Sequence, residues 1–236
     1  MENPFDFFDK IFYINLDHRT DRKELMENQF NKFGIIAERF SAINLTKEQN
    51  EDMVKRGCNF YDGPRPEYAP RIKSCTISHL TVLYRSKMMD YNNVLIFEDD
   101  ALIDENIIED LKKCVDDLKN IEWDMFYLGC NPLEYFKETE NLGRVVRTTT
   151  NHAYAINRRF YDRILTHSNF FKYYPCNDGY YGSLGRDKNM KIYMALKNLV
   201  TQRENYSDIE NGNVNYTSSI NDKYKYNLIE KPEGWL

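Results

Sequence analysis

The stretch NVLIFEDDALI, residues 93–103, decides the fold class of this chain. Its segment 94–97 is a continuous apolar run, as expected for a central strand that helices cover on both faces. Three carboxylates, Glu98, Asp99 and Asp100, follow at the carboxyl end of that strand. Because open α/β sheets bind ligands outside the carboxyl ends of their strands, this edge is the first place to expect a functional site.

Outward from this strand, β-prone runs alternate with amphipathic helical segments. The predicted strands are 10–16, 35–43, 94–97, 123–129, 144–158 and 190–196, and the predicted helices are 21–33, 46–57, 72–90, 104–119 and 159–167. Prolines and polar residues predict loops at 58–70 and 131–142. The alternation predicts an α/β fold with a mostly parallel central sheet and helices on both faces. The 236-residue length suits one domain of this kind.

Composition excludes several classes of protein. The net charge is −5, and Lys and Arg are spread along the chain without a basic block, so no nucleic-acid partner is expected. No apolar run reaches the roughly 18 residues that a transmembrane helix needs. The first residues lack the basic start and apolar stretch of a signal peptide. We therefore expect a cytoplasmic protein, either free or peripherally attached to a membrane.

Five cysteines are scattered without Cys-x-x-Cys spacing. They are Cys58, Cys75, Cys114, Cys130 and Cys176. The odd number and irregular spacing predict reduced thiols, with neither a zinc site nor a disulfide framework.

The acidic triplet has two interpretations. Consecutive carboxylates repel one another, and a hard divalent cation with oxygen ligands removes that repulsion. Glu98 and Asp100 share one face of an extended strand, so they are the predicted metal ligands, while Asp99 would orient the loop or bind a ribose. The alternative is a solvated strand end or a set of helix-capping acids. His152, which precedes a strand, is a less favoured third ligand.

The turn after the first strand is the second candidate feature. Arg19 and Arg22 lie where a strand leads into a helix, and they are able to hold a diphosphate by charge-assisted hydrogen bonds beside the helix N-terminus. From this segment alone, a capping turn with surface arginines is the simpler interpretation. The chain has no G-x-G-x-x-G or G-x-x-x-x-G-K-[ST] motif, which argues against dinucleotide oxidoreductases and P-loop enzymes.

Seven blocks in order resemble glycosyltransferase family 25, which includes lipooligosaccharide and procollagen galactosyltransferases. The blocks are IFYINLDHRTDR (11–22), ERFSAI (38–43), SCTISHLTVLYR (74–85), NVLIFEDDALI (93–103), WDMFYLG (123–129), HAYAINRRFYDRIL (152–165) and LVTQRENYSDI (199–209). The resemblance implies a GT-A type fold, a UDP-sugar donor, Mn²⁺ or Mg²⁺, and inverting transfer to a hydroxyl. It also implies a nucleotide-binding half at about 1–130 and an acceptor and catalytic half at about 131–210, with 211–236 left as an irregular tail.

The same resemblance assigns roles to individual positions. Glu98, Asp99 and Asp100 match the acidic motif; Asn15, Arg19 and Arg22 the opening nucleotide-binding block; Ser78 and His79 the Ser-His pair; Gln202, Ser207 and Asp208 the closing block. His18 departs from the pattern, because the family more often has Arg or Lys there, which weakens phosphate contacts. His79 by itself fits a structural histidine as well as a phosphate or ribose ligand.

Asp178 is the candidate catalytic base. It matches an acidic residue of the family and lies in an aromatic, glycine-flanked segment with Tyr173, Tyr174, Tyr180 and Tyr181. A carboxylate there is able to take the proton of the acceptor hydroxyl. An N-cap of a helix at 179–187 is an equal alternative, and Asp187 is a weaker candidate base.

Three functions remain open on the sequence. The first is a metal-dependent glycosyltransferase that moves a sugar, with galactose favoured and glucose or N-acetylglucosamine possible, from UDP to a glycan, lipooligosaccharide or collagen-like protein acceptor. The second is a catalytically silent protein of the same fold that binds a glycan or nucleotide. The third is a nucleotide-sugar hydrolase, in which water replaces the acceptor.

Overall fold

The computed structural model describes residues 3–57, 69–166, 176–207, 209, 212–214 and 227–235. Its helices are η1 (Pro4–Phe7), α1 (Thr20–Phe33), α2 (Lys47–Lys55), α3 (Ala69–Met88), α4 (Ile107–Leu118), α5 (Arg158–Leu165) and α7 (Asn177–Leu184). Its strands are β1 (Lys10–Asn15), β2 (Ala37–Ser41), β3 (Asn93–Glu98), β4 (Ala101–Ile103), β5 (Met125–Lys137), β6 (Leu142–Asn157), β7 (Ile192–Ala195), β8 (Val200–Gln202), β9 (Asn205–Ser207) and β10 (Gly212–Val214).

The central sheet has six strands in the order β2-β1-β3-β6-β5-β7. β1 pairs in parallel with β2 and β3, and β5 pairs in parallel with β7, while β6 runs antiparallel to its neighbours. Only β6 therefore opposes the common direction, and the prediction of a mostly parallel α/β sheet is confirmed. Apolar residues of β3 are fully buried, as the run at 94–97 predicted.

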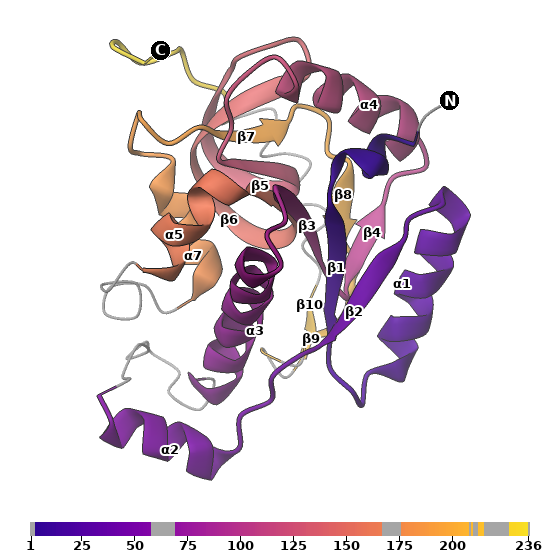
Figure 1. Ribbon diagram of the computed structural model, residues 1–236, viewed down its shortest axis with the longest axis vertical. Helices are drawn as coiled ribbons and strands as arrows, with labels where there is room; N and C mark the ends of the chain where they lie inside the picture. The colour runs from indigo at the N-terminus through magenta and orange to yellow at the C-terminus, as the bar shows by residue number, and fades with distance from the viewer. Residues whose placement is uncertain are drawn as a thin grey trace.

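Helices cover both faces of this sheet (Figure 1). On one face, α1, α4 and η1 pack around residues such as Met26, Phe30 and Leu111. On the other face, α3, α5 and α7 pack around Val82, Phe160 and their neighbours. The two apolar clusters make a three-layer arrangement in which the sheet is buried on both sides.

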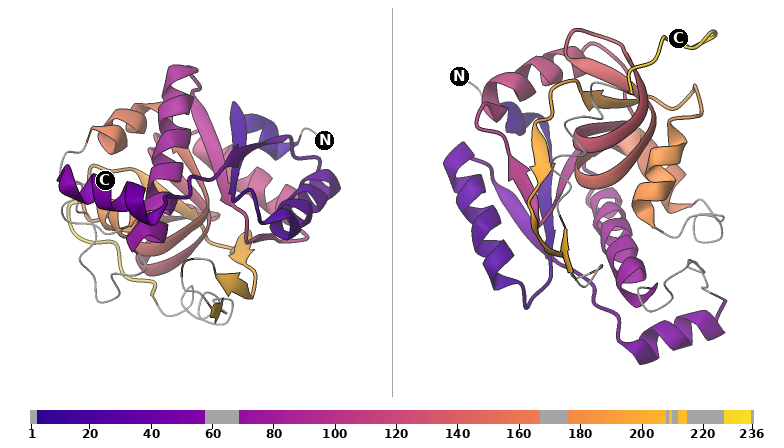
Figure 2. Two further views of the ribbon diagram at one scale, coloured as in Figure 1. Left: turned by 90° about the horizontal axis from the view of Figure 1, so that it is seen from below. Right: turned by 180° about the vertical axis from the view of Figure 1, so that it is seen from behind.

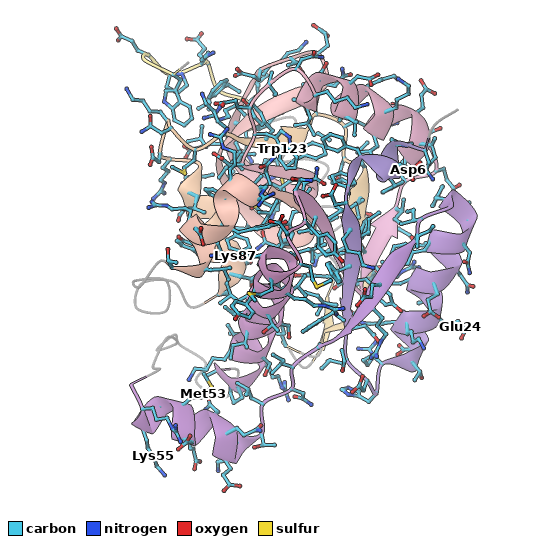
Figure 3. All side chains as sticks on the ribbon, viewed as in Figure 1. Asp6, Glu24, Met53, Lys55, Lys87 and Trp123 are labelled. Atoms are coloured by element: carbon cyan, nitrogen blue, oxygen red, sulfur yellow. The ribbon has the colours of Figure 1, made fainter. Side chains whose placement is uncertain are left out.

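Helix α2 is the exception to this packing. Met53 and Lys55 on this helix lie at the outer end of the molecule, away from the sheet (Figure 3). Its start is fixed locally by a capping box, in which Thr46 Oγ1 accepts from Gln49 N at 3.1 Å and Gln49 Oε1 accepts from Thr46 N at 2.9 Å. Thr46 was the predicted cap of this helix.

The predicted loop at 131–142 is wrong, because strand β5 continues to Lys137 and forms a long hairpin with β6. Figure 2 shows this hairpin curling away from the plane of the other strands. Pro132 lies between two register shifts, and such bulges are where an antiparallel ladder tolerates a residue without an N–H. Polar composition and one proline therefore did not mark a loop here.

The predicted loop at 58–70 and residues Tyr173 and Tyr174 fall outside the described residues, apart from the start of α3 at Ala69. Within the predicted irregular tail at 211–236, the described parts are the short strand β10 and a segment, 227–235, with one β-bridge. Strand β10 pairs with β9, and Ile229 N donates to Tyr135 O at 2.8 Å, which anchors the segment 227–235 to β5.

Helix α7 lies directly on β6 at Gly182. A Cβ atom added there would lie 1.8 Å from Thr148 O, whereas a Cβ at Gly179 in the same helix would meet only Cys176 Sγ, at 3.4 Å. The absence of a side chain at position 182 lets this helix approach the strand, and the approach sets the position of Asp178 in the first turn.

We expect Gly182→Ala to lower the free energy of unfolding by about 1–3 kcal/mol, because the new methyl group forces α7 away from β6. Gly179→Ala is the matched control, with an expected gain of about 0.5–1 kcal/mol from improved helix propensity. Urea denaturation of both variants measures the difference. Equal effects in the two variants would contradict the close approach at Gly182.

Candidate functional site

The carboxyl ends of β1 and β3 meet at one edge of the sheet. The two strands are parallel neighbours, with Ile14 beside Glu98 in the ladder. The turn that follows β1 and the acidic triplet that follows β3 therefore lie side by side. This is the edge at which open α/β sheets bind ligands.

Asp99 holds these two turns together. Its Oδ2 accepts from Asn15 Nδ2 at 2.8 Å and its Oδ1 accepts from Arg22 Nη1 at 2.6 Å, and all three residues are buried. Asn15 Oδ1 also accepts from Arg39 Nε at 2.8 Å. The Asp99 charge is thus neutralised by Arg22, and the side chain of Asn15 is committed to positioning the turn.

We expect Arg22→Met to lower the free energy of unfolding by about 3–5 kcal/mol, because the change leaves the buried Asp99 carboxylate without its counter-charge. Arg56→Met removes the same groups from an exposed pair with Asp52, so its expected cost is about 0–1 kcal/mol. Chemical denaturation measures both. The double variant Arg22→Met/Asp99→Asn also removes the charge of Asp99. If it is as unstable as Arg22→Met alone, the unpaired Asp99 carboxylate is not the cause of the lost stability.

Glu98 and Asp100 also border the cleft. Among the described residues, neither has an arginine as close as Arg22 is to Asp99. Asp100 Oδ2 lies 4.0 Å from Arg22 Nη1, and Oδ1 has no hydrogen-bond partner among the residues that the structure describes. Burial and the charge of Glu98 raise the pKa of Asp100 to about 7, against the opposing effect of Arg22 and a hydrogen bond from Gln202. Glu98 and Asp100 therefore repel each other, and a cation bound between them would relieve this repulsion.

His79 supports Glu98 from helix α3. Its Nε2 lies 3.2 Å from Glu98 Oε1, and its Nδ1 lies 2.7 Å from the Tyr154 hydroxyl. Burial acts to raise the pKa of Glu98, but the hydrogen bond and charge of His79 outweigh it and hold this pKa below its ordinary value. The structure therefore places His79 as a neighbour of the carboxylate.

Ser78 joins α3 to the segment after β2. Its Oγ accepts from Ile43 N at 2.8 Å and donates to Ser74 O at 2.7 Å. Ser74 Oγ makes the equivalent bond one turn earlier, accepting from Leu45 N at 2.9 Å. The two hydroxyls fix the wall of the cleft.

A cleft with a volume of about 430 Å³ opens between these elements, within the usual size of ligand pockets. Its residues are Ile14, Leu16, His18, Arg22, Ala42, Ile43, Asn44, Arg71, Ser74, Cys75, Ser78, His79, Glu98, Asp99, Asp100 and Ile209. The cleft therefore combines an acidic edge from β3 with basic groups from the turn after β1 and the start of α3. Such a combination suits a cation together with a polyanion.

Several predicted residues lie elsewhere. Arg19 forms an ion pair with Asp21, with Nη2 and Oδ2 2.9 Å apart, and is not among the residues found lining the described cleft. Gln202, on β8, approaches the cleft through its hydrogen bond to Asp100. His152 Nε2 lies 2.9 Å from Val200 O, so the ring on β6 contacts the backbone of β8, and burial lowers the pKa of His152.

Asp178 lies in the first turn of α7. The predicted N-cap role is wrong, because the helix begins at Asn177 and its N-cap is Cys176. Asp178 Oδ1 accepts from Gly179 N at 2.9 Å. Asp187 is exposed beyond the other end of the helix, where it accepts from Asn189 N at 3.0 Å.

Asp178 is not one of the residues that line the described cleft, but it lies close to Cys75, which does. Burial first, and then the charges of Glu98 and Asp178, raise the pKa of Cys75 well above its ordinary value. The Cys75 thiol thus lies near both carboxylates. The Ser207 side chain and Asp208, from the predicted closing block, fall outside what the structure describes.

Sequence reasoning missed Arg71, Ser74, Cys75 and Asn44 as cleft residues. Cys75 and His79 are four apart on a predicted helix, and that spacing, which places both on one face, was the available signal. Arg71 carried no comparable signal, because it follows a proline-rich segment and its approach to the cleft depends on how α3 packs. The four described cysteines form no disulfide bond with one another, and Cys58 lies outside the described ranges. Across the described residues, no helix is long and apolar enough to cross a membrane.

Comparison with known proteins agrees with the resemblance seen in the sequence. The model of glycosyltransferase family 25 (LPS biosynthesis protein) matches residues 8–207. Among solved structures, the mannose-1-phosphate geranyltransferase of Thermus thermophilus shares a TM-score of 0.42 and 10% identity over 79% of this chain and 72% of that one. At this level the structural likeness is remote, and no function follows from it.

Curated relatives carry the same family name. A glycosyltransferase 25 family member of Drosophila pseudoobscura pseudoobscura is 32% identical over 51% of this chain, and one of Drosophila melanogaster is 29% identical over 58%. A human relative, named inactive glycosyltransferase 25 family member 3, is 26% identical over 56%. The matches cover only 20%, 24% and 23% of those three proteins. Because the family model matches residues 8–207 of 236, this chain belongs to glycosyltransferase family 25.

Proposed function

We propose that this protein is a metal-dependent, inverting glycosyltransferase of GT-A type that uses a UDP-sugar donor. Galactose is the favoured sugar, with glucose or N-acetylglucosamine as alternatives, and the acceptor is a hydroxyl of a glycan, lipooligosaccharide or collagen-like protein. The observation that carries the proposal is the 430 Å³ cleft in which Glu98 and Asp100 face basic groups at the carboxyl edge of the sheet. Family membership supports transfer of a sugar as the reaction class.

Glu98 and Asp100 suit a bound Mn²⁺ or Mg²⁺. Both offer carboxylate oxygens, which hard divalent cations prefer, and Asp100 Oδ1 has no other partner in the described part of the chain. Asp99 is less suited, because Arg22 and Asn15 occupy both of its oxygens. A cation held there supplies Lewis-acid stabilisation of the negative charge that develops on the diphosphate.

Basic and polar groups of the cleft would bind the rest of the donor. Arg22, His18 and Arg71 line the cleft. Arg71 contributes positive potential toward a diphosphate, whereas the charge of Arg22 is shared with Asp99. Arg19 reaches the diphosphate only if its pair with Asp21 opens. Five more residues belong to the proposed donor site because they hold the turns, the cleft wall and the carboxylates in position. They are Asn15, Asp99, Ser78, His79 and Gln202.

Transfer requires one bond to form as another breaks. The acceptor oxygen attacks the anomeric carbon while the bond from that carbon to the diphosphate oxygen breaks, and the electron pair leaves with UDP. The sugar passes through an oxocarbenium-like state, as in other glycosyl chemistry. Asp178 is the proposed base that takes the acceptor proton.

One alternative has an observation in its favour. The human relative named inactive shows that a protein of this family can carry that description, so a silent donor-binding protein is the second candidate. Retention of the acidic triplet together with Arg22 in one cleft favours an active enzyme.

The test is incubation with Mn²⁺ and a panel of UDP-sugars, with and without acceptor glycans and glycosylated or collagen-like peptides. We expect product only with metal and acceptor, and loss of product with a chelator. Binding of UDP without any product would support the silent protein. Release of UDP at the same rate with and without acceptor would instead support the hydrolase.

A further inference from the structure

A second group of metal-binding side chains lies in the wall of the cleft. Cys75 and His79 are one helical turn apart on α3, and both face Glu98 at the end of β3. One ligand atom from each of the three residues lies within 4.8 Å of the other two. The third ligand comes from another element, which is why the cysteine spacing in the sequence predicted no zinc site.

His79 is oriented toward this group by its other nitrogen. The ring is fully buried, and its Nδ1 lies 2.7 Å from the Tyr154 hydroxyl. The Tyr154 ring also packs against the Tyr181 ring, with their centroids 5.7 Å apart. The contact at Nδ1 fixes the imidazole in place, as contacts of the second ring nitrogen do for histidine ligands of metals.

This orientation leaves His79 Nε2 facing Glu98. Nε2 lies 3.2 Å from Glu98 Oε1 in a poorly aligned contact and has no well-formed hydrogen bond to any described residue. A cation between the two atoms would bind both, and the nearby Cys75 sulfur completes a set of three ligands.

The distances suit a small cation after a modest adjustment. Zinc bonds of about 2.0–2.3 Å in a tetrahedral site place ligand atoms roughly 3.3–3.8 Å apart. A pair of ligand atoms at the present limit of 4.8 Å therefore has to close by about 1.0–1.5 Å to bind such a cation. Because all three residues line the cleft, the fourth position would open toward the cavity.

We propose that Cys75, His79 and Glu98 form a three-ligand site for a borderline-soft divalent cation of the Zn²⁺ class. Thiolate and imidazole select Zn²⁺ over Mn²⁺, whereas the Glu98–Asp100 pair offers oxygen alone. On binding, the S–H bond of Cys75 breaks, its proton passes to solvent, and the sulfur bonds the cation. Glu98 belongs to both sets, so the two cations compete; this consequence, unlike the binding itself, rests on the proposed function.

Cobalt is the probe for this site, because Co²⁺ replaces Zn²⁺ and shows a thiolate-to-metal charge-transfer band in the near ultraviolet. The purified chain is titrated with CoCl₂ without any nucleotide, as wild type, Cys75→Ser and Cys114→Ser. Cys114 is a buried thiol on α4, packed in the cluster on the opposite face of the sheet, so its loss is the matched control. We expect the band in wild type and Cys114→Ser and its loss in Cys75→Ser, with ZnCl₂ displacing the cobalt. No band in wild type, or a band that survives in Cys75→Ser, overturns the proposal.

A second measurement needs no variant. The wild-type chain is treated with a small thiol-reactive reagent, and labelling of the Cys75 peptide is followed by mass spectrometry. Stoichiometric ZnCl₂ should slow labelling of Cys75 at least tenfold, while MnCl₂ should leave the rate unchanged. Equal rates with and without ZnCl₂ mean that His79 and Glu98 form only an ion pair. Since UDP is absent from both experiments, their result is independent of the donor chemistry.

Discussion

Asp100→Ala is expected to abolish metal-stimulated sugar transfer while the fold survives. Asp100 is one of two carboxylates left to a cation at the cleft, and without it a single carboxylate from Glu98 has to hold Mn²⁺ in the cleft. The same change removes a charge that Glu98 and Asp99 repel. The free energy of unfolding should therefore stay the same or rise, even though activity is lost. Turnover assays at several Mn²⁺ concentrations and urea denaturation measure the two effects separately.

Asp116→Ala is the control for this change. Asp116 is an exposed acid on α4 whose i,i+4 pair with Lys112 is worth little, so neither activity nor stability should move measurably. The metal assignment fails if Asp100→Ala retains full activity, or if wild-type activity is unchanged by a chelator. A variant that is inactive because it unfolds would show a lower denaturation midpoint.

The sequence predicted the sheet and its edge because these depend on local patterns. The apolar run at 94–97 predicts a strand buried on both faces, and acids directly after such a strand lie at the sheet's carboxyl edge. Parallel pairing of β1 with β3 then brings the turn after β1 to the same edge. The strand and the acids after it follow from local sequence alone, whereas the pairing of β1 with β3 is a long-range contact that the structure supplies.

The roles inside the site depended on packing that the sequence does not encode locally. Arg22 could bind a diphosphate or a neighbouring acid, and the choice of Asp99 follows from how α1 lies against the sheet. The extension of β5 through Pro132 depends on bulges, whose register is set by the partner strand. Likewise, the grouping of Cys75 with Glu98 requires α3 to pack beside β3.

The sequence placed Asp178 in a loop or at a helix start, and the structure excludes only the N-cap interpretation, so the role as base stays a prediction. Since Cys176 is the N-cap of α7, the carboxylate is left in the first turn of the helix. Its recorded contacts are local ones, with Gly179 N and the Cys176 thiol. A half-buried carboxylate near the cleft wall with no ion pair to the described residues is suited to accept a proton.

Asp178→Asn should lower turnover by about 10²–10⁴-fold with little change in donor affinity, because the amide keeps the bond from Gly179 N but cannot take the acceptor proton. Steady-state kinetics give kcat, and calorimetry with UDP gives the donor Kd. Asp187→Asn makes the same change just beyond the C-terminal end of α7, where the carboxylate is exposed and does not line the described cleft, so kcat should stay within about twofold of wild type. Equal losses of kcat and donor affinity in Asp178→Asn would make Asp178 a donor-binding or structural residue. Asp178→Ala distinguishes a base from a structural residue. A base predicts that alanine loses as much activity as asparagine, whereas a structural acceptor for Gly179 N predicts that asparagine restores activity.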